Sequence, residues 1–314
     1  MGACVSRDSD ELDQYSSPTL DISNRWRVFK FTFGETPYLC IHDFQESTSK
    51  FLTPQFTFPL ISYSCICKSL QLFIAGGINL STNAVVGKVW NGLVRDGVLE
   101  MKRVASMHCA RCKPFLVSPL SDGFFAIGGF YHPRYADSVS KDCEQYIESE
   151  DRWEELAPLN YPPKSVFVVS TFIYAFREFG NSMAFERFNA AFTEERKWEL
   201  LQMNTSLENV EKINDFSISS AGGRIYIFGG VDKLGNPSGN IYSLEINTKE
   251  LIKLPQLLER EMISLDCYVD TEDYSYYLSK ELRLCIFNKR QVKWTFAKSE
   301  ILKEAYSQNI SIKC

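Results

Sequence analysis

The chain has 314 residues, of which 45% are hydrophobic and 23% are charged, a composition that suits a folded protein with a substantial core. Its formal net charge of -5 argues against a nucleic-acid-binding role, because phosphate recognition needs a basic stripe. The 23 Phe, 15 Tyr and 5 Trp residues favour pleated, half-buried strands, so the composition predicts an all-β fold.

The first residues, MGACVS, fit the M-G-x-x-x-[ST] pattern for N-myristoylation at Gly2, and Cys4 is a candidate S-palmitoylation site beside it. One myristoyl chain binds membranes only marginally, and Arg7 is the only basic residue nearby, so acylation of both Gly2 and Cys4 is the consistent interpretation. Residues 1–24 are then expected to form a flexible tail, in which Arg7 to Asn24 act as a tether with a reach of about 23 Å. The alternative is an ordinary unmodified tail.

No secretory signal is visible, and no apolar run approaches the roughly 20 residues that a membrane helix needs. We therefore expect a cytoplasmic protein that is associated with the cytoplasmic leaflet through its lipid anchor. Its ten cysteines are expected to stay reduced in that compartment.

From Arg25 onwards, apolar segments recur with a fixed period. Gly-Gly doublets that begin at Gly76, Gly128 and Gly229 follow three of them, and the spacings of 52 and 101 residues are one and two periods of about 50. Extended in both directions, the period predicts a central strand in each of six units, at 28–34, 72–77, 124–129, 172–180, 225–230 and 274–279. A further strand is predicted before each central one, at 62–67, 114–118, 165–170, 216–220, 264–269 and 309–313. The last of these can only complete the N-terminal unit.

A third strand is expected next, and then an apolar or aromatic residue seven positions on. The pairs are Phe44 and Phe51, Tyr146 and Trp153, Leu244 and Leu251, Phe287 and Trp294, with Phe188 and Trp198 as a stretched version. This order of elements resembles the Kelch repeat family, most strongly around Gly129 and Gly230, and the resemblance covers Arg25 to Cys314. It implies an all-β, six-bladed propeller of four-stranded antiparallel blades at 25–314, closed by the C-terminal strand pairing with the N-terminal blade. We expect the protein to be a monomer without a cofactor.

In such a blade, the longer loops and the connections between blades emerge on one face, where we expect binding. The segments on that face are 78–87, 130–142, 231–239 and the connection 101–113. Two of them gather basic and aromatic residues that predict a site for an acidic peptide of a protein partner, since arginine forks pair with carboxylates. These residues are Lys102, Arg103, His108, Arg111, Lys113, His132, Arg134 and Tyr135. The alternative is a solvated pair of loops without a partner.

Other functions stay open. The Kelch resemblance includes propeller enzymes of the copper-oxidase and sugar-mutarotase types, but His42, His108 and His132 belong to three different units, so no catalytic, cofactor-binding or metal-binding residue is predicted. The segment His108 to Cys112 (HCARC) contains a C-x-x-C pattern, for which a zinc site would need two more ligands. Substrate recognition for a ubiquitin ligase, also allowed by the resemblance, would require a separate partner.

Overall fold

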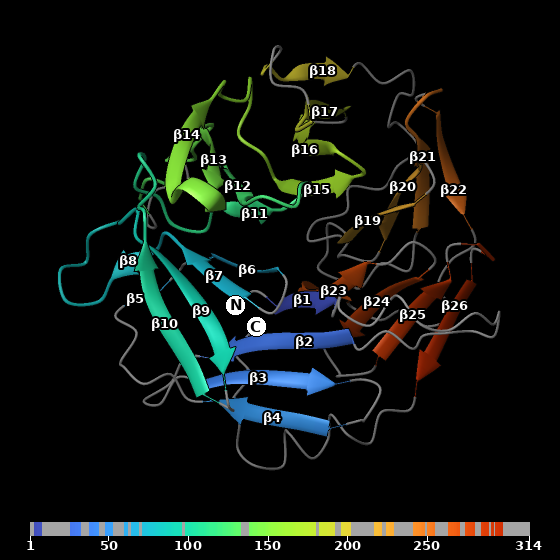
Figure 1. Ribbon diagram of the computed structural model, residues 1–314. Coiled ribbons are helices and arrows are strands. Elements are labelled where there is room, and N and C mark those ends of the chain that lie inside the picture. The colour runs from blue at the N-terminus through green and yellow to red at the C-terminus, as the bar shows by residue number, and fades with distance from the viewer. Residues whose placement is uncertain are drawn as a thin grey trace. The chain divides into compact units, whose positions relative to one another are not determined.

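The recurring element of the chain is a four-stranded antiparallel sheet, built from strands that follow one another along the sequence. A computed structural model (Figure 1) contains six such sheets, numbered sheet 1 to sheet 6 in chain order, within the residues that it describes. The described residues are 3–7, 26–32, 38–43, 48–52, 60–61, 64–68, 71–95, 98–132, 138–179, 182–191, 196–201, 217–221, 224–228, 241–248, 250–254, 263–270, 274–279, 284–288, 290–291 and 293–297. The chain divides into two compact units, unit 1 (Met1–Leu156) and unit 2 (Ala157–Ile312).

Unit 1 holds sheets 1 to 3, a small two-stranded sheet and one 3₁₀ turn. Sheet 1 is β1 (Ala3–Arg7), β2 (Trp26–Thr32), β3 (Tyr38–Asp43) and β4 (Thr48–Leu52). Sheet 2 is β6 (Ser64–Lys68), β7 (Gln71–Ala75), β9 (Val89–Arg95) and β10 (Val98–Val104), and beside it β5 (Leu60–Ile61) pairs with β8 (Ile78–Asn79). Sheet 3 is β11 (Phe115–Val117), β12 (Phe124–Ile127), β13 (Cys143–Ile147) and β14 (Arg152–Leu156), with the turn η1 (Glu148–Glu150) before its last strand.

Unit 2 holds sheets 4 to 6. Sheet 4 is β15 (Ser165–Val169), β16 (Phe172–Phe179), β17 (Ser182–Asn189) and β18 (Glu199–Leu201). Sheet 5 is β19 (Ser217–Ala221), β20 (Arg224–Phe228), β21 (Ile241–Glu245) and β22 (Glu250–Leu254). Sheet 6 is β23 (Ile263–Asp270), β24 (Tyr274–Ser279), β25 (Leu284–Asn288) and β26 (Lys293–Ala297).

The all-β prediction is confirmed, and each of the six expected repeats corresponds to one sheet. Wherever a predicted first or second strand lies among the described residues, it agrees with the observed strand to within two residues at either end. The pattern of burial explains why the second strands were easy to find. All four positions of β12 are buried, so it is apolar throughout, whereas the outermost strand β14 alternates buried Trp153 and Leu156 with more exposed residues. No helix among the described residues is long and apolar enough to cross a membrane.

The first strand of sheet 1 differs from the prediction. We expected residues 1–24 to be a flexible tail and residues 309–313 to pair beside β2. Instead, β1 pairs antiparallel with β2, with Ala3 opposite Lys30 and Arg7 opposite Trp26, while β3 occupies the other edge of β2. The prediction for 1–24 is therefore wrong at Ala3–Arg7, and the predicted partner of 309–313 is already paired on both edges. The physical reason is that any extended segment within reach can satisfy the backbone groups of an open edge. Residues 309–313 themselves lie outside the described part of the chain.

Gly-Gly doublets end the second strands of sheets 2 and 3. Gly76 and Gly77 have φ angles of 70° and 113°, and Gly128 and Gly129 have φ angles of 61° and 102°, values that side chains disfavour. A Cβ atom at Gly76 would lie 2.2 Å from the carbonyl oxygen of Arg111. Each doublet therefore ends the second strand of its sheet and leaves space for a backbone segment from elsewhere in the chain to approach closely.

Sheet 4 shows what happens without a doublet. At the corresponding place it has Arg177 and Glu178, and β16 and β17 remain paired up to Phe179 and Ser182, forming one long hairpin. Sheet 4 consequently has no long loop at this end, in contrast to sheets 2 and 3. The expected loss of the doublet in this repeat is thus matched by a change in structure.

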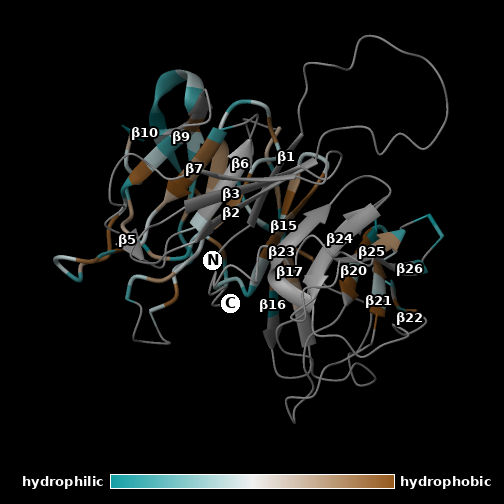
Figure 2. Cartoon of the chain, turned by 90° about the horizontal axis from the view of Figure 1, so that it is seen from below, coloured by the Kyte–Doolittle hydropathy of each residue, from teal (hydrophilic) through white to brown (hydrophobic). Residues whose placement is uncertain are grey.

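Aromatic residues fill the core of unit 1 between sheets 2 and 3. Phe73 of β7 lies 5.0 Å from Phe124 of β12, measured between ring centroids, and Tyr146 and Trp153 pack against Phe124 at 5.2 and 5.4 Å. Each such pair contributes about 0.5–1.5 kcal/mol beyond the burial of apolar area. Figure 2 shows the same preference by colour, since β7 in unit 1 and β20 and β21 in unit 2 carry hydrophobic residues.

In three sheets the seven-residue spacing relates residues of the third and fourth strands that face each other, namely Tyr146 and Trp153, Leu244 and Leu251, and Phe287 and Trp294. The residues of the stretched spacing make a ring contact, with the centroids of Phe188 and Trp198 5.3 Å apart. In sheet 1, Phe51 lies on the fourth strand as expected, opposite Cys40 of β3. Phe44 is outside the described residues.

The turn between β11 and β12 provides a test of the sheet geometry. Gly123 has a φ angle of 82°, and a Cβ atom there would lie 1.7 Å from the carbonyl oxygen of Tyr146. We expect Gly123→Ala to lower the free energy of unfolding by at least about 2 kcal/mol, measured by urea denaturation. Exposed Ser121 lies in the same turn, and Ser121→Ala should change the stability little. Equal effects of the two substitutions would contradict the geometry at Gly123.

Candidate binding surface

Three segments of unit 1 meet at one end of sheets 2 and 3. They are residues 76–88, residues 105–114, and the described parts of the third segment, 128–132 and 138–142; together these are called the loop surface. The N–H of Gly77 donates to the carbonyl of Arg111 at 3.0 Å. Cys112 and Phe130 exchange two backbone hydrogen bonds of 2.8 Å. The expected grouping of these segments is thus confirmed, while the segment 231–239 lies outside the described residues.

The start of the connection is corrected. We expected it to begin at Met101, but β10 continues through Val104, so Lys102 and Arg103 belong to an outer strand. Both side chains are exposed, and they lie opposite Asn91 and Trp90 of β9. Because successive side chains of a strand point to opposite faces, these two cations cannot act as one patch. Only Arg103 reaches towards the connection, where its Nη2 lies 3.4 Å from the Oγ of Ser106.

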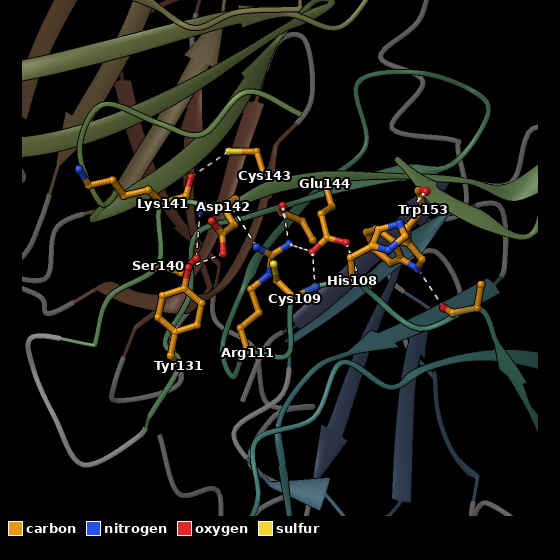
Figure 3. Close-up of polar contacts among 12 residues, drawn as sticks. His108, Cys109, Arg111, Tyr131, Ser140, Lys141, Asp142, Cys143, Glu144 and Trp153 are labelled. Atoms are coloured by element: carbon orange, nitrogen blue, oxygen red, sulfur yellow. Dashed lines mark hydrogen bonds and ion pairs between the residues drawn. The ribbon is translucent and has the colours of Figure 1, made fainter. Parts of the chain in front are cut away.

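Arg111 is the main departure from the predicted binding set (Figure 3). Its side chain is 0% exposed, and its Nη2 lies 2.8 Å from Oε1 of Glu144, which is itself 1% exposed. The same guanidinium donates to the carbonyls of Asp142 at 2.9 Å and of Ala126 at 3.3 Å. Arg111 therefore stabilises the interior, and no partner can reach it.

Glu144 fixes the connection as well as the arginine. Its carboxylate accepts the backbone N–H of His108 at 2.7 Å and that of Cys109 at 3.2 Å. The indole N–H of Trp153 donates to the carbonyl of Ala105 at 2.9 Å. One carboxylate and one indole of sheet 3 thus hold the segment that leads into the same sheet, an arrangement that we call the clamp.

Sheet 4 of unit 2 repeats the clamp. Glu186 of β17 accepts the backbone N–H groups of Asn160 and Tyr161 at 2.9 and 3.0 Å, and the indole N–H of Trp198 donates to the carbonyl of Ala157 at 3.0 Å. In both sheets the carboxylate binds the third and fourth residues after the carbonyl that accepts from the indole. The two sheets therefore share these hydrogen bonds as well as the spacing of their strands. The sequence analysis did not identify either glutamate. Each stands inside an otherwise largely apolar strand, which is a detectable sign of a satisfied buried charge.

The cysteine segment lacks the properties of a reactive or metal-binding site. Burial, followed by the negative charge of Asp142, raises the pKa of the Cys109 thiol to about 11, so it is protonated at neutral pH. Burial also raises the pKa of Cys112, whose thiol donates to the carbonyl of Phe130. The Nε2 of His108 lies 3.0 Å from the carbonyl oxygen of Trp153. Within the ranges described by the structure, no group of three or more His, Cys, Asp or Glu side chains is arranged to hold a metal ion.

Among the described residues of the loop surface, two lysines are exposed. Lys113 and Lys141 are exposed, and Lys113 holds a φ angle of 49°, an uncommon value for a residue with a side chain. His132 is half-buried, and its backbone N–H donates to the Oγ of Ser138 at 3.1 Å. Arg134 and Tyr135 lie outside the described residues.

Two exposed side chains with large apolar parts on the loop surface were missing from the predicted set. Tyr131 is 45% exposed, and Leu80 is 58% exposed at the tip of the loop after β8. The hydroxyl of Tyr131 donates to the carboxylate of Asp142, and its pKa is raised by burial and then by that carboxylate. At the other tip, Oδ1 of Asn79 accepts the backbone N–H of Ser81 at 2.9 Å and orders the turn. Both apolar residues are therefore presented on ordered backbone.

The opposite end of sheet 3 carries the opposite charge. The turns there, at 118–123 and 148–151, hold four carboxylates, namely Asp122, Glu148, Glu150 and Asp151. The cation beside them, Arg152, is engaged by the carboxylates of Glu150 and Glu154. Along sheet 3 the exposed lysines lie at one end and these four carboxylates at the other, and the carboxylate of Asp151 also accepts the backbone N–H of Ala105 at 2.8 Å.

In comparisons with known proteins, no protein-family model and no curated protein matches the sequence of this chain.

The two clamps offer a matched test of the buried ion pair. Glu144→Gln keeps an oxygen acceptor but leaves the buried Arg111 without its carboxylate, which should lower the free energy of unfolding by about 3–5 kcal/mol. Glu186→Gln changes the equivalent residue, whose described contacts are Asn160 and Tyr161, and should cost about 1–2 kcal/mol. The measurement is urea denaturation of the full chain. Equal losses would mean that the ion pair adds nothing to the stability of sheet 3.

The thiol of Cys109 offers a test of the surface electrostatics. With a pKa of about 11 in place of 9.0, the thiolate fraction at about pH 8 should be about a hundredfold lower than in the urea-unfolded chain. Alkylation by iodoacetamide, followed by mass spectrometry of the peptide that contains Cys109, should slow accordingly. Asp142→Asn removes a negative charge that opposes thiolate formation, so it should lower the pKa and speed the reaction. Rapid alkylation of the folded parent at this pH would contradict the assignment.

Proposed function

We propose that this chain is a non-catalytic binding protein: a closed six-bladed propeller of Kelch type whose loop surface recognises an acidic segment of a partner protein. Six successive four-stranded sheets and the repeated clamp support the propeller. A ring of sheets supplies a rigid frame, on which loops can present side chains for binding with little loss of entropy.

The separation of charge within sheet 3 carries the proposal. Lys113 and Lys141 are exposed on the loop surface, whereas the carboxylates of the turns gather at the other end. Such a field attracts an anionic ligand to one end and repels it from the other. Leu80 and Tyr131 are exposed on the same loop surface and can anchor an apolar side chain, as central hot-spot residues do in interfaces. The partner segment is thus acidic and contains at least one apolar residue.

The proposal also includes acylation of Gly2, with Cys4 as a second acylation site, which would hold the protein at the cytoplasmic leaflet. The motif MGACVS supports it. A membrane-bound adaptor needs no reaction chemistry of its own, and the raised pKa of Cys109 is consistent with a protein that binds without a reactive thiol at this surface.

The test is a selection of random phage-displayed peptides on the full chain. The parent should enrich acidic sequences, and a control with exposed lysines of unit 2 reversed, Lys253→Glu with Lys293→Glu, should enrich the same ones. Lys113→Glu with Lys141→Glu applies the same change of charge to the loop surface and should abolish the enrichment. Raised salt should weaken binding of the selected peptides, because exposed charges are screened. Peptides without acidic bias, or enrichment that survives the reversal, would overturn the proposed site.

A further inference from the structure

The strand β1 changes the expected mode of attachment. A tether of residues 7–24 would let the protein hang some distance from the membrane, but Ala3–Arg7 form a strand of sheet 1, in which Ala3 pairs with Lys30. The residue that would carry the acyl chain, Gly2, directly precedes this strand in the sequence. One residue spans about 3.8 Å, so an acyl chain on Gly2 would hold unit 1 directly at the bilayer.

The chain path determines which end of sheet 1 carries Gly2. A sheet of four successive antiparallel strands begins and finishes at the same end, so β1 begins where β4 ends, at Leu52. From there the chain continues to β5, which pairs with β8 next to the loop surface. The connection 105–114 between sheets 2 and 3 joins the same ends of those sheets. The start of β1 at Ala3, to which Gly2 is joined, and the loop surface therefore lie on the same side of unit 1.

This side also carries the chemistry that anionic headgroups bind. A single myristoyl chain gives marginal, reversible attachment and needs a second signal. The sequence near Gly2 provides no basic cluster, but the exposed Lys113 and Lys141 lie on the loop surface, and Arg103 is exposed at the end of β10. Leu80 and Tyr131 are exposed on the same loop surface, and tyrosine is enriched at membrane interfaces. The four carboxylates of sheet 3 lie in the turns at its opposite end, and one of them, Asp151, accepts the backbone N–H of Ala105 at 2.8 Å.

We infer that the loop surface of unit 1 is a membrane-contact site for anionic phospholipid headgroups, which acts together with an acyl chain on Gly2. This inference rests on the acylation in the proposed function, but it does not depend on the protein partner. The basic signal that the N-terminal sequence lacks is supplied by loops more than a hundred residues further along the chain.

The test uses the full chain, myristoylated by coexpression with an N-myristoyltransferase, and its sedimentation with vesicles of phosphatidylcholine with or without phosphatidylserine. Phosphatidylserine should strengthen binding. Lys113→Gln and Lys141→Gln should each weaken it about fivefold on these vesicles, which corresponds to about 1 kcal/mol per charge, and should have no effect on phosphatidylcholine alone. Arg152→Gln removes the same charge at the opposite end of sheet 3 and should leave binding unchanged.

Hydrogen exchange provides a readout that does not depend on substitutions. Vesicles should slow exchange in peptides that cover 79–84 and 138–142, and should leave 148–151 unaffected. Binding that ignores phosphatidylserine and both lysine substitutions, or protection at 148–151, would overturn the inference, while acidic peptide selection could still stand. A chain that carries no myristate on Gly2 after coexpression would remove the membrane site and the proposed acylation together.

Discussion

A buried carboxylate on the third strand of a sheet, satisfied by the segment that leads into that sheet, is the constraint on which the loop surface depends. In sheet 3 the carboxylate is Glu144, and it neutralises Arg111 where both are shielded from water. Removing either group would leave an uncompensated charge in the interior, which is far more costly than losing an exposed pair. The loops at this end are consequently fixed before any ligand arrives, and Lys113 and Lys141 project from a rigid frame.

The fold could be predicted largely because it depends on local patterns. The apolar stretch FFAI at Phe124 reads as a strand buried on both faces, and the glycines after it have φ angles that few other residues adopt. Edge pairing could not be predicted in the same way. Ala3–Arg7 and residues 309–313 are both short and partly apolar. Nothing in the sequence tells which of the two segments pairs more strongly with the free edge of β2.

The binding surface was predicted at the level of segments and only partly at the level of residues. Charged residues in a predicted connection are expected to be exposed, and Lys113 is. Arg111 is only two positions away, yet it is buried against Glu144. This burial could not be predicted, because Glu144 is thirty-three positions further on and the two side chains meet only once sheet 3 has formed. The apolar members of the surface, Leu80 and Tyr131, carry no signal in the sequence that separates them from core residues. Their exposure follows from ordered loop tips.

The pairing of β1 with β2 also affects how the protein would tolerate processing. A chain cleaved after Arg7, or translated from a later start, would lose the strand that covers one edge of β2 and expose a row of unsatisfied N–H and C=O groups. Such an edge recruits strands from other molecules, so the shortened species would tend to exchange segments or aggregate. A foreign peptide fused before Gly2 would start one residue from this strand and could disturb the same edge.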